Sequence, residues 1–244
     1  MGELIAVLSG KGGTGKTSVC AGICTALAKE GFDVLAIDCD MGLQNLDISL
    51  GMSDTAALSF LDVCEGGYPL EQAARHPIFD HLRFLTAPVN RSADSVDSAA
   101  FGNLLRQAKA SFDYVFLDAP AGIDSGFELA ARFAERILLV TLADPAAVRD
   151  ASRAGQCLER MGKQDVRLVV NRVNGRVFSN MAVTVDDAMA TAGLPLIGVV
   201  PDDPNMTLAA AFSKPLLLQT RRGAARACVS IAKRIQGLRV PLSI

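Results

Sequence analysis

Near the N-terminus, the segment SGKGGTGKTS has the residue types and the spacing that bind phosphate. Gly10, Gly15, Lys16 and Thr17 satisfy the pattern G-x-x-x-x-G-K-[ST]. In such a loop the backbone N–H groups wrap around phosphate, the lysine reaches the β- and γ-phosphate oxygens, and the threonine hydroxyl is a ligand for Mg²⁺. The segment therefore predicts a nucleoside triphosphate site. It also holds a second lysine, Lys11, which the pattern does not require.

Three aspartates that follow apolar runs supply the carboxylates that Mg²⁺ and an attacking water would need. Asp38 and Asp40 belong to the segment DCD after the run VLAI, and Asp118 ends the run YVFLD. Asp118 resembles a Walker B residue. Either Asp38 or Asp40, taken alone, would be interpreted as an ordinary loop or helix-capping residue. Their position after a strand, in a chain with a phosphate loop, favours a role in catalysis.

The segment DAPAG, which starts at Asp118, predicts a loop that responds to the nucleotide. The N–H of Gly122 at its end would meet a γ-phosphate, and loops ordered by that phosphate are a recurrent switching device. The alternative is a plain Pro/Gly turn. The chain has only two histidines, His76 and His81, which we expect at the surface, so histidine chemistry has little support.

Alternating strands and helices are expected to position these residues. The apolar runs that predict strands cover 4–9, 33–38, 82–87, 114–119, 136–142, 166–171 and 196–201. Helical patterns cover 17–29, 99–110, 146–161 and 222–235. The alternation predicts an α/β fold of three layers, with a mostly parallel central sheet flanked by helices. The candidate residues stand where strands end, at the edge where such sheets bind ligands. A length of 244 residues suits one domain over 1–244.

Composition excludes several classes of protein. The six cysteines form no C-x-x-C pair, which argues against a zinc site, a disulfide framework and an iron–sulfur carrier. The longest uncharged run, 188–201, is too short to span a membrane. The N-terminal sequence MGELIAVLSG lacks the character of a signal peptide, so we expect a cytoplasmic protein.

The C-terminal part of the chain is basic. The net charge is −2, yet the last 41 residues contain seven lysines and arginines and no acidic residue. The last helical pattern nevertheless places a set of small and apolar residues on one face, so we expect that face to pack on the core. This set consists of Ala224, Ala227, Cys228, Ile231 and Ile235.

Together these features resemble the MinD/ParA family of P-loop ATPases, whose phosphate loop carries the same additional lysine and is called a deviant Walker A motif. The resemblance covers essentially the whole chain. It rests on SGKGGTGKTS, DCDMGLQNLDISLG (38–51), LDAPAGIDSG (117–126), VRDASR (148–153), LVVNR (168–172) and GVVPDD (198–203). It implies a P-loop NTPase fold with ATP and Mg²⁺ as cofactors, and slow ATP hydrolysis that a partner stimulates.

The resemblance also implies roles for individual residues. Lys16 would hold phosphate, Asp40 would orient the attacking water, and Lys11 would cross an ATP-dependent homodimer to the phosphates bound by the other subunit. A cation supplied in this way stabilises the charge of a transferring phosphoryl group. The implied metal ligands are Thr17, Asp38 and Asp118. The implied nucleotide contacts are Gly10, Lys11, Gly12, Gly13, Thr14, Gly15, Lys16, Thr17, Ser18, Gly122, Asn171, Arg172, Pro201, Asp202 and Asp203. Of these, Asn171 and the segment from Pro201 to Asp203 would hold adenine.

For function, the resemblance implies an ATP-dependent dimerisation switch in the spatial regulation of the cell-division (septum) site. Its implied partners are a MinC-like division inhibitor and a MinE-like or other ATPase-stimulating regulator. A ParA-like DNA-partition or FlhG-like flagellar-placement ATPase is the alternative, although we do not expect DNA to be the partner.

Two departures from the family stand out. Gln44 occupies a position where MinD members of the family have arginine. Those members also generally continue past the final core helix into a short basic amphipathic tail that inserts into membrane, whereas this chain ends at Ile244. We therefore expect only weak, peripheral contact with an anionic membrane surface, on the inner face of the cell membrane.

Overall fold

The computed structural model describes residues 2–174 and 185–242. Within them, one sheet has the strand order β3-β4-β2-β5-β1-β6-β7-β8. Neighbouring strands are parallel, except that β3 is antiparallel to β4. The strands are β1 (Glu3–Leu8), β2 (Val34–Asp38), β3 (Ala74–Arg75), β4 (Leu82–Leu85), β5 (Tyr114–Asp118), β6 (Arg136–Leu142), β7 (Asp165–Val173) and β8 (Leu196–Pro201). All the strands expected from the sequence are present, and β3 is too short to give a periodic signal.

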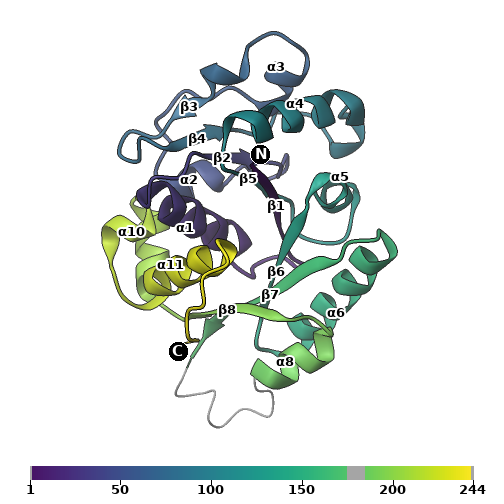
Figure 1. The fold of residues 1–244 in the computed structure, drawn as a ribbon, viewed down its shortest axis with the longest axis vertical. Helices are drawn as coiled ribbons and strands as arrows, with labels where there is room; N and C mark the ends of the chain where they lie inside the picture. Colours follow the sequence, from purple (N-terminus) through teal and green to yellow (C-terminus); the bar gives the residue numbers. More distant parts are fainter. Residues whose placement is uncertain (1, 175–184, 243–244) are drawn as a thin grey trace.

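Helices cover both faces of this sheet, as Figure 1 shows, and the three-layer α/β fold is confirmed. One layer consists of α1 (Lys16–Lys29), α2 (Leu46–Leu50), α9 (Pro204–Ala211), α10 (Leu216–Gln219) and α11 (Gly223–Ile235). The other consists of α3 (Phe60–Cys64), α4 (Ser98–Ser111), α5 (Ser125–Phe133), α6 (Pro145–Arg160) and α8 (Val185–Ala192). Two single turns of 3₁₀ helix, η1 (Leu70–Gln72) and η2 (Ala93–Ser95), lie in the connections.

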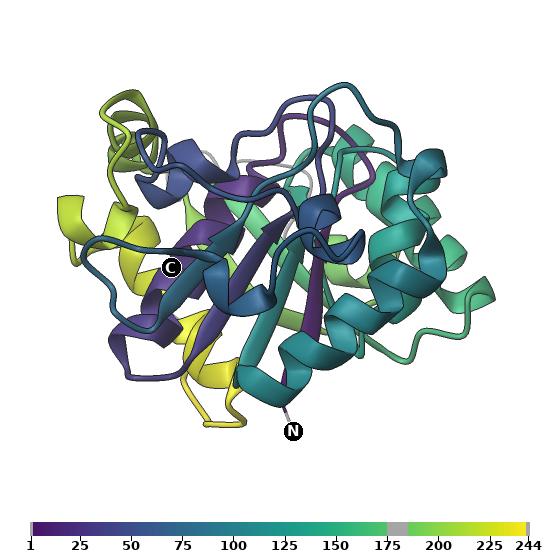
Figure 2. The same ribbon diagram turned by 90° about the horizontal axis from the view of Figure 1, so that it is seen from above.

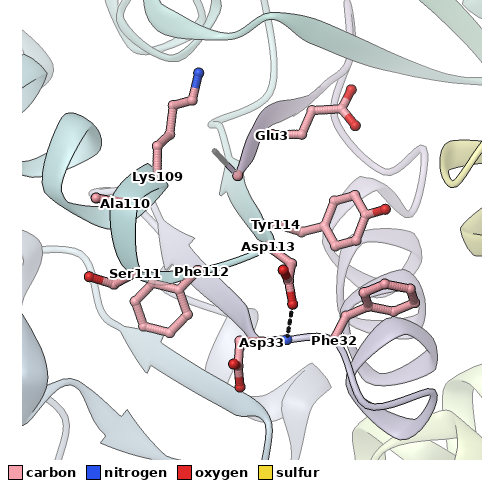
Figure 3. Close-up of a pocket in the computed structure, with 10 residues that line it drawn as sticks. Glu3, Phe32, Asp33, Lys109, Ala110, Ser111, Phe112, Asp113 and Tyr114 are labelled. Carbon is pink, nitrogen blue, oxygen red and sulfur yellow. Dashed lines mark hydrogen bonds between the residues drawn. The ribbon is translucent and has the colours of Figure 1, made fainter.

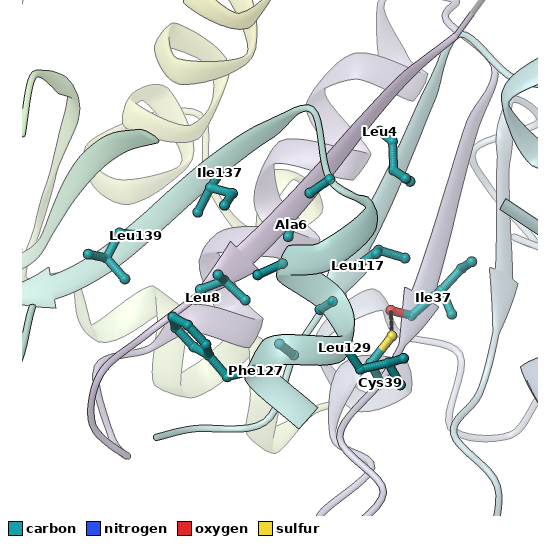
Figure 4. Close-up of a cluster of buried hydrophobic side chains, with 14 of the residues drawn as sticks. Leu4, Ala6, Leu8, Ile37, Cys39, Leu117, Phe127, Leu129, Ile137 and Leu139 are labelled. Carbon is teal, nitrogen blue, oxygen red and sulfur yellow. Dashed lines mark hydrogen bonds between the residues drawn. The ribbon is translucent and has the colours of Figure 1, made fainter. Parts of the chain in front are cut away.

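The central strands are buried on both faces. Leu4 and Leu8 of β1 belong to the core under α5, whereas Ile5 and Val7 belong to the core under α1. Figure 4 shows the first of these cores, where Phe127 of α5 lies over β1. Successive side chains of a strand point to opposite faces, so a strand that is covered on both faces consists of consecutive apolar residues.

The carboxyl ends of the parallel strands form one edge of the sheet. In Figure 2, β1 rises from the N-terminus at the bottom toward this edge, where the loops that follow β1 and β2 lie together. The sheet thereby gathers the candidate residues that the sequence places at strand ends.

The basic C-terminal helix packs on the sheet and on α1. The face of α11 expected to be apolar is buried, as predicted. At Gly22 of α1, a Cβ atom would lie 2.6 Å from Sγ of Cys228 in α11, so glycine permits close contact between the two helices. None of the helices in the described parts of the chain combines the length and the apolar character needed to cross a membrane.

The expectation that His76 lies at the surface is wrong. Its side chain is 3% exposed, because the ring has three backbone partners in the interior. Nε2 lies 2.8 Å from the carbonyl oxygen of Leu50, and Nδ1 accepts from the N–H groups of Ile78 and Phe79. Burial lowers the pKa of His76. His81 is exposed, as expected.

Candidate active site

The phosphate loop leads from β1 into the first turn of α1. Gly13 and Gly15 have φ angles of 78° and 80°, in the left-handed region that residues with a Cβ atom rarely adopt. A Cβ atom on Gly10 would lie 2.5 Å from the carbonyl oxygen of Asp150, and one on Gly15 would collide with the amide of Asn171. The N-cap of α1 has no side-chain hydrogen bond, and the first turn has no acidic residue. The positive end of the helix is therefore available to an anion.

Lys16 forms a buried ion pair with Asp118 at the end of β5. Its Nζ lies 2.6 Å from Oδ1 of Asp118, and the two side chains are 6% and 0% exposed. Burial opposes the charge of Lys16, but the Asp118 carboxylate outweighs it and raises the pKa of the lysine. Nζ also lies 3.3 Å from Oγ1 of Thr17. The lysine is thus held charged at the phosphate loop.

Asp38 and Asp118 are paired in register at the carboxyl ends of β2 and β5. Burial, followed by the nearby charge of Asp118, raises the pKa of Asp38 to about 7. Complete burial also raises the pKa of Asp118, and Lys16 opposes that rise. A divalent cation would relieve the repulsion between two such carboxylates. The structure therefore brings together two of the predicted metal ligands, and Thr17 follows Lys16 at the same place.

The donor set is suited to Mg²⁺. The described residues contain no cluster of three or more His, Cys, Asp and Glu side chains that would hold a metal without help. Magnesium is usually bound by one or two carboxylates, with water and substrate phosphates as its other ligands. Two carboxylates and a hydroxyl beside a phosphate loop match that requirement.

Four buried polar atoms around this site have no hydrogen-bond partner within the described part of the chain. They are Oγ of Ser9, Oγ1 of Thr14, Oδ2 of Asp118 and Oδ1 of Asn171. Buried polar groups are nearly always paired, so their concentration at the phosphate loop points to a polar ligand. Oδ2 of Asp118 can serve a metal ion, and Oδ1 of Asn171 can accept from an amino group. The residues present therefore fit Mg²⁺ and a nucleotide.

The four residues expected around adenine all line one pocket of about 420 Å³ beside the phosphate loop. They are Asn171, Pro201, Asp202 and Asp203, and three further predicted nucleotide contacts, Gly15, Ser18 and Arg172, join them. Met206, Thr207 and Ala210 of α9 complete the wall and were not anticipated. Asp203 followed by Pro204 is a pattern typical of a helix start, and this pattern in the sequence could have predicted α9.

Two of these pocket residues also hold the structure together. Nδ2 of Asn171 donates to the carbonyl oxygen of Thr14 at 2.7 Å, which joins β7 to the phosphate loop. Asp203 accepts from the N–H of Asn205 in α9 and from the N–H of Ala224 in α11, both at 2.9 Å. Burial works in the opposite direction, but these hydrogen bonds lower the pKa of Asp203. Asp203 thus shapes the pocket by fixing the starts of two helices.

Asp40 lies in the loop after β2, and Asp38 holds the backbone of that loop. Oδ1 of Asp38 accepts from the N–H of Asp40 at 2.8 Å, and Oδ2 accepts from the N–H of Leu46 at 3.1 Å. Oδ1 of Asp40 accepts from the N–H groups of Gly42 and Leu43. One carboxylate at the strand end therefore orders the segment that carries the other.

The segment 118–122, which is expected to respond to the nucleotide, contacts the phosphate loop. The N–H of Gly122 donates to the carbonyl oxygen of Ser9 at 3.1 Å, so in this structure it is already engaged. A Cβ atom on Gly12 would lie 3.9 Å from Cβ of Ala121. Lys11 is partly exposed and makes no hydrogen bond or ion pair with the described residues. It differs in this respect from Lys16, whose charge is already paired.

A separate cavity of about 400 Å³ lies at the opposite edge, around the amino ends of the strands (Figure 3). Phe32 and Tyr114 meet there edge to face, with ring centroids 5.4 Å apart. Oδ2 of Asp113 accepts from the N–H of Asp33 at 2.8 Å. None of the residues assigned to nucleotide chemistry lines this cavity.

Comparison with known proteins agrees with this geometry. Residues 5–216 match the CobQ/CobB/MinD/ParA nucleotide binding domain family. The chain is 36% identical to the septum site-determining protein MinD of Bacillus subtilis, over 100% of this chain and 92% of that protein. It resembles the MinC:MinD cell division protein complex of Aquifex aeolicus with a TM-score of 0.92 and 34% identity, over 99% of this chain and 98% of that chain.

A more distant relative carries a nucleotide. It is the septum site-determining protein MinD of Pyrococcus horikoshii complexed with Mg-ADP, with a TM-score of 0.83, 27% identity, and 96% of each chain covered. The resemblance inferred from the sequence motifs is confirmed by these matches. The chain therefore belongs to the CobQ/CobB/MinD/ParA nucleotide-binding family and has its P-loop NTPase fold.

Proposed function

We propose that this chain is a MinD-like ATPase that takes part in selecting the cell-division site, with residues 1–244 acting as one ATPase domain. The observation that carries the proposal is the buried Lys16–Asp118 pair beside Asp38 at a phosphate loop, in a chain that resembles MinD over its whole length. The cofactors would be ATP and Mg²⁺, and the products ADP and phosphate. The full-length MinD relatives favour this function over the ParA-like and FlhG-like alternatives.

The residues of one subunit would bind and orient the nucleotide. The N–H groups at the start of α1 and the ammonium of Lys16 meet the phosphates, because both present positive charge at the loop. The pocket that includes Asn171 and Pro201 would hold adenine. Thr17, Asp38 and Asp118 would hold Mg²⁺, which neutralises the charge on the β- and γ-phosphates. Asp40 would orient the water that attacks the γ-phosphate.

A second copy of the chain would complete the site. Lys11 lies partly exposed on the phosphate loop without a partner among the described residues. We propose that it reaches the phosphates of the other subunit in an ATP-dependent homodimer. Gly122 would take part in that switch by exchanging the carbonyl oxygen of Ser9 for the γ-phosphate.

The proposed partners follow from the relatives. The Aquifex aeolicus structure is a complex of MinC with MinD, which supports a MinC-like inhibitor as a partner here. A MinE-like or other regulator would stimulate hydrolysis. Exposed Arg221, Arg222 and Arg226, which lie before and in the first turn of α11, would form a basic surface for weak peripheral contact with anionic lipid at the inner face of the cell membrane. The protein would otherwise be cytoplasmic.

Size-exclusion chromatography with light scattering tests the central part of this proposal. The variant Asp40→Ala should bind ATP without hydrolysing it and should be a monomer with ADP and a dimer with ATP and Mg²⁺. Repeating the measurement with anionic vesicles separates dimerisation from lipid binding. A monomer under all conditions would contradict the dimerisation switch, and tight binding to duplex DNA would favour the ParA-like alternative.

A further inference from the structure

One side chain joins two loops at the edge of the sheet where the carboxyl ends of the parallel strands lie. Gln44 lies in the loop after β2, and its Nε2 donates to the carbonyl oxygen of Pro88 at 3.0 Å. Pro88 follows β4 and is buried, so its carbonyl group is a fixed point of attachment. The hydrogen bond spans 44 positions of the sequence and connects the loop that carries Asp40 to its neighbour.

The backbone of Gln44 is strained. Its φ angle is 49°, in the left-handed region, where residues other than glycine, asparagine and aspartate are uncommon. Such conformations persist only where the surroundings hold them, and they concentrate at functional sites. The N–H of Gln44 donates to the carbonyl oxygen of Asp40 at 3.1 Å, so the strained residue closes a turn that begins at Asp40.

The rest of this turn is held by local contacts. Within the described part of the chain, Oδ1 of Asp40 accepts only from the N–H groups of Gly42 and Leu43, and Leu43 is 70% exposed. Met41 packs partly against the core. Among the side chains of residues 40–45, within the part of the chain that the structure describes, only that of Gln44 forms a hydrogen bond with another loop.

We propose that Gln44 is a positioning residue for ATP hydrolysis. Its hydrogen bond to Pro88 fixes the turn that begins at Asp40, and this directs the Asp40 carboxylate toward the attacking water. The inference rests on the proposed function, because the role of Asp40 is part of it. The proposed role depends on the hydrogen-bond donor of the Gln44 side chain. The size of that side chain and the backbone conformation of Gln44 are not sufficient without the donor.

Three substitutions separate the donor from size and strain. Gln44→Glu keeps the size but presents an acceptor to a carbonyl group, and Gln44→Gly removes both the strain and the donor. Both should lower kcat for ATP hydrolysis about tenfold, because small errors in the position of a catalytic group are costly.

Gln44→Lys keeps a donor of sufficient reach and should retain kcat within about threefold of the unaltered protein. The KM for ATP should stay within about twofold in all three, because Gln44 does not line the nucleotide pocket.

The matched control is Gln107→Glu, which makes the same change of charge on the exposed surface of α4 and should leave kcat unchanged. Amide hydrogen exchange of residues 39–46, measured without nucleotide, gives a second readout. Exchange should become faster in Gln44→Glu and Gln44→Gly, and should stay at the level of the unaltered protein in Gln44→Lys and in the control.

Several results would overturn the inference. They are an unchanged kcat and exchange rate in Gln44→Glu, a Gln44→Gly variant as active as the unaltered protein, and a lowered Tm with unchanged kcat. If the unaltered protein does not hydrolyse ATP, the proposed function fails. The exchange rates of the same variants then still decide whether Gln44 holds the loop.

Discussion

Lys16 and Asp118 are 2.6 Å apart, from Nζ to Oδ1, and both side chains are almost fully buried. Each needs the other, since an unpaired charge in the interior is strongly unfavourable. The same lysine must also meet the phosphate of the proposed nucleotide. Asp118 therefore keeps the lysine charged and in place before the nucleotide arrives.

Lys16→Ala should abolish ATP binding, because the phosphates lose their cation. It should also lower the free energy of unfolding by about 3–5 kcal/mol, because Asp118 remains buried without its partner. Equilibrium binding of ATP and urea unfolding measure the two effects. The control is Lys29→Ala, an exposed lysine in the last turn of the same helix. ATP binding of normal affinity by Lys16→Ala would contradict the assigned site.

Lys11→Ala should keep ATP binding but lose hydrolysis, because Lys11 is proposed to act on the nucleotide of the other subunit. Asp40→Ala should be inactive as well. When the Lys11→Ala and Asp40→Ala variants are mixed in equal amounts, each heterodimer has one complete site, which combines Asp40 of one subunit with Lys11 of the other. Activity should return to about a quarter of that of the unaltered protein, as random pairing of a symmetric dimer gives. The idea fails if Lys11→Ala hydrolyses ATP normally or if mixing restores nothing.

The raised pKa of Asp38 predicts a pH dependence of stability in the absence of nucleotide. Its ordinary value of 3.8 rises to about 7 in the folded protein, so the folded state binds more protons between these values. The contribution of Asp38 to the free energy of unfolding should therefore fall as pH rises through this window, by at most about 1.4 kcal/mol per pH unit.

Urea unfolding of the unaltered protein and of Asp38→Asn at pH 5, 6, 7 and 8 measures this contribution. The difference between the two slopes isolates Asp38 from the other titrating groups. The unaltered protein should lose stability relative to Asp38→Asn as pH rises. Parallel curves would show that Asp38 titrates at its ordinary value.

Ala210→Phe should weaken ATP binding at least tenfold, because Ala210 lines the pocket expected to hold adenine and the added ring would occupy that space. Ala211→Phe is the matched control, since the next residue of α9 is exposed and does not line the pocket. Titration with ATP and thermal unfolding distinguish a blocked pocket from a damaged helix. Equal affinities in the two variants would remove this pocket from the nucleotide site.

The features that could be predicted from the sequence are those determined by residues close together in the chain. The phosphate loop follows from residue spacing, and the buried strands follow from unbroken apolar runs. Because parallel strands end at one edge, the meeting of Asp38 and Asp118 could also be expected.

Contacts between distant segments could not be read in the same way. The burial of His76 depends on a carbonyl group of Leu50 that lies 26 positions away. The hydrogen bond from Gln44 to Pro88 depends on how two loops happen to lie. The α9 wall of the nucleotide pocket depends on the direction that the chain takes after Asp203, which also fixes the start of α11.

The close contact at Gly22 has a mechanical consequence. With Sγ of Cys228 so near, residue 22 has no space for a side chain, and a larger residue there would push α1 and α11 apart. α1 begins at the phosphate loop, and α11 begins where the N–H of Ala224 donates to Asp203 of the pocket beside that loop. A change in the spacing of the two helices would therefore reach both the phosphate loop and the pocket beside it.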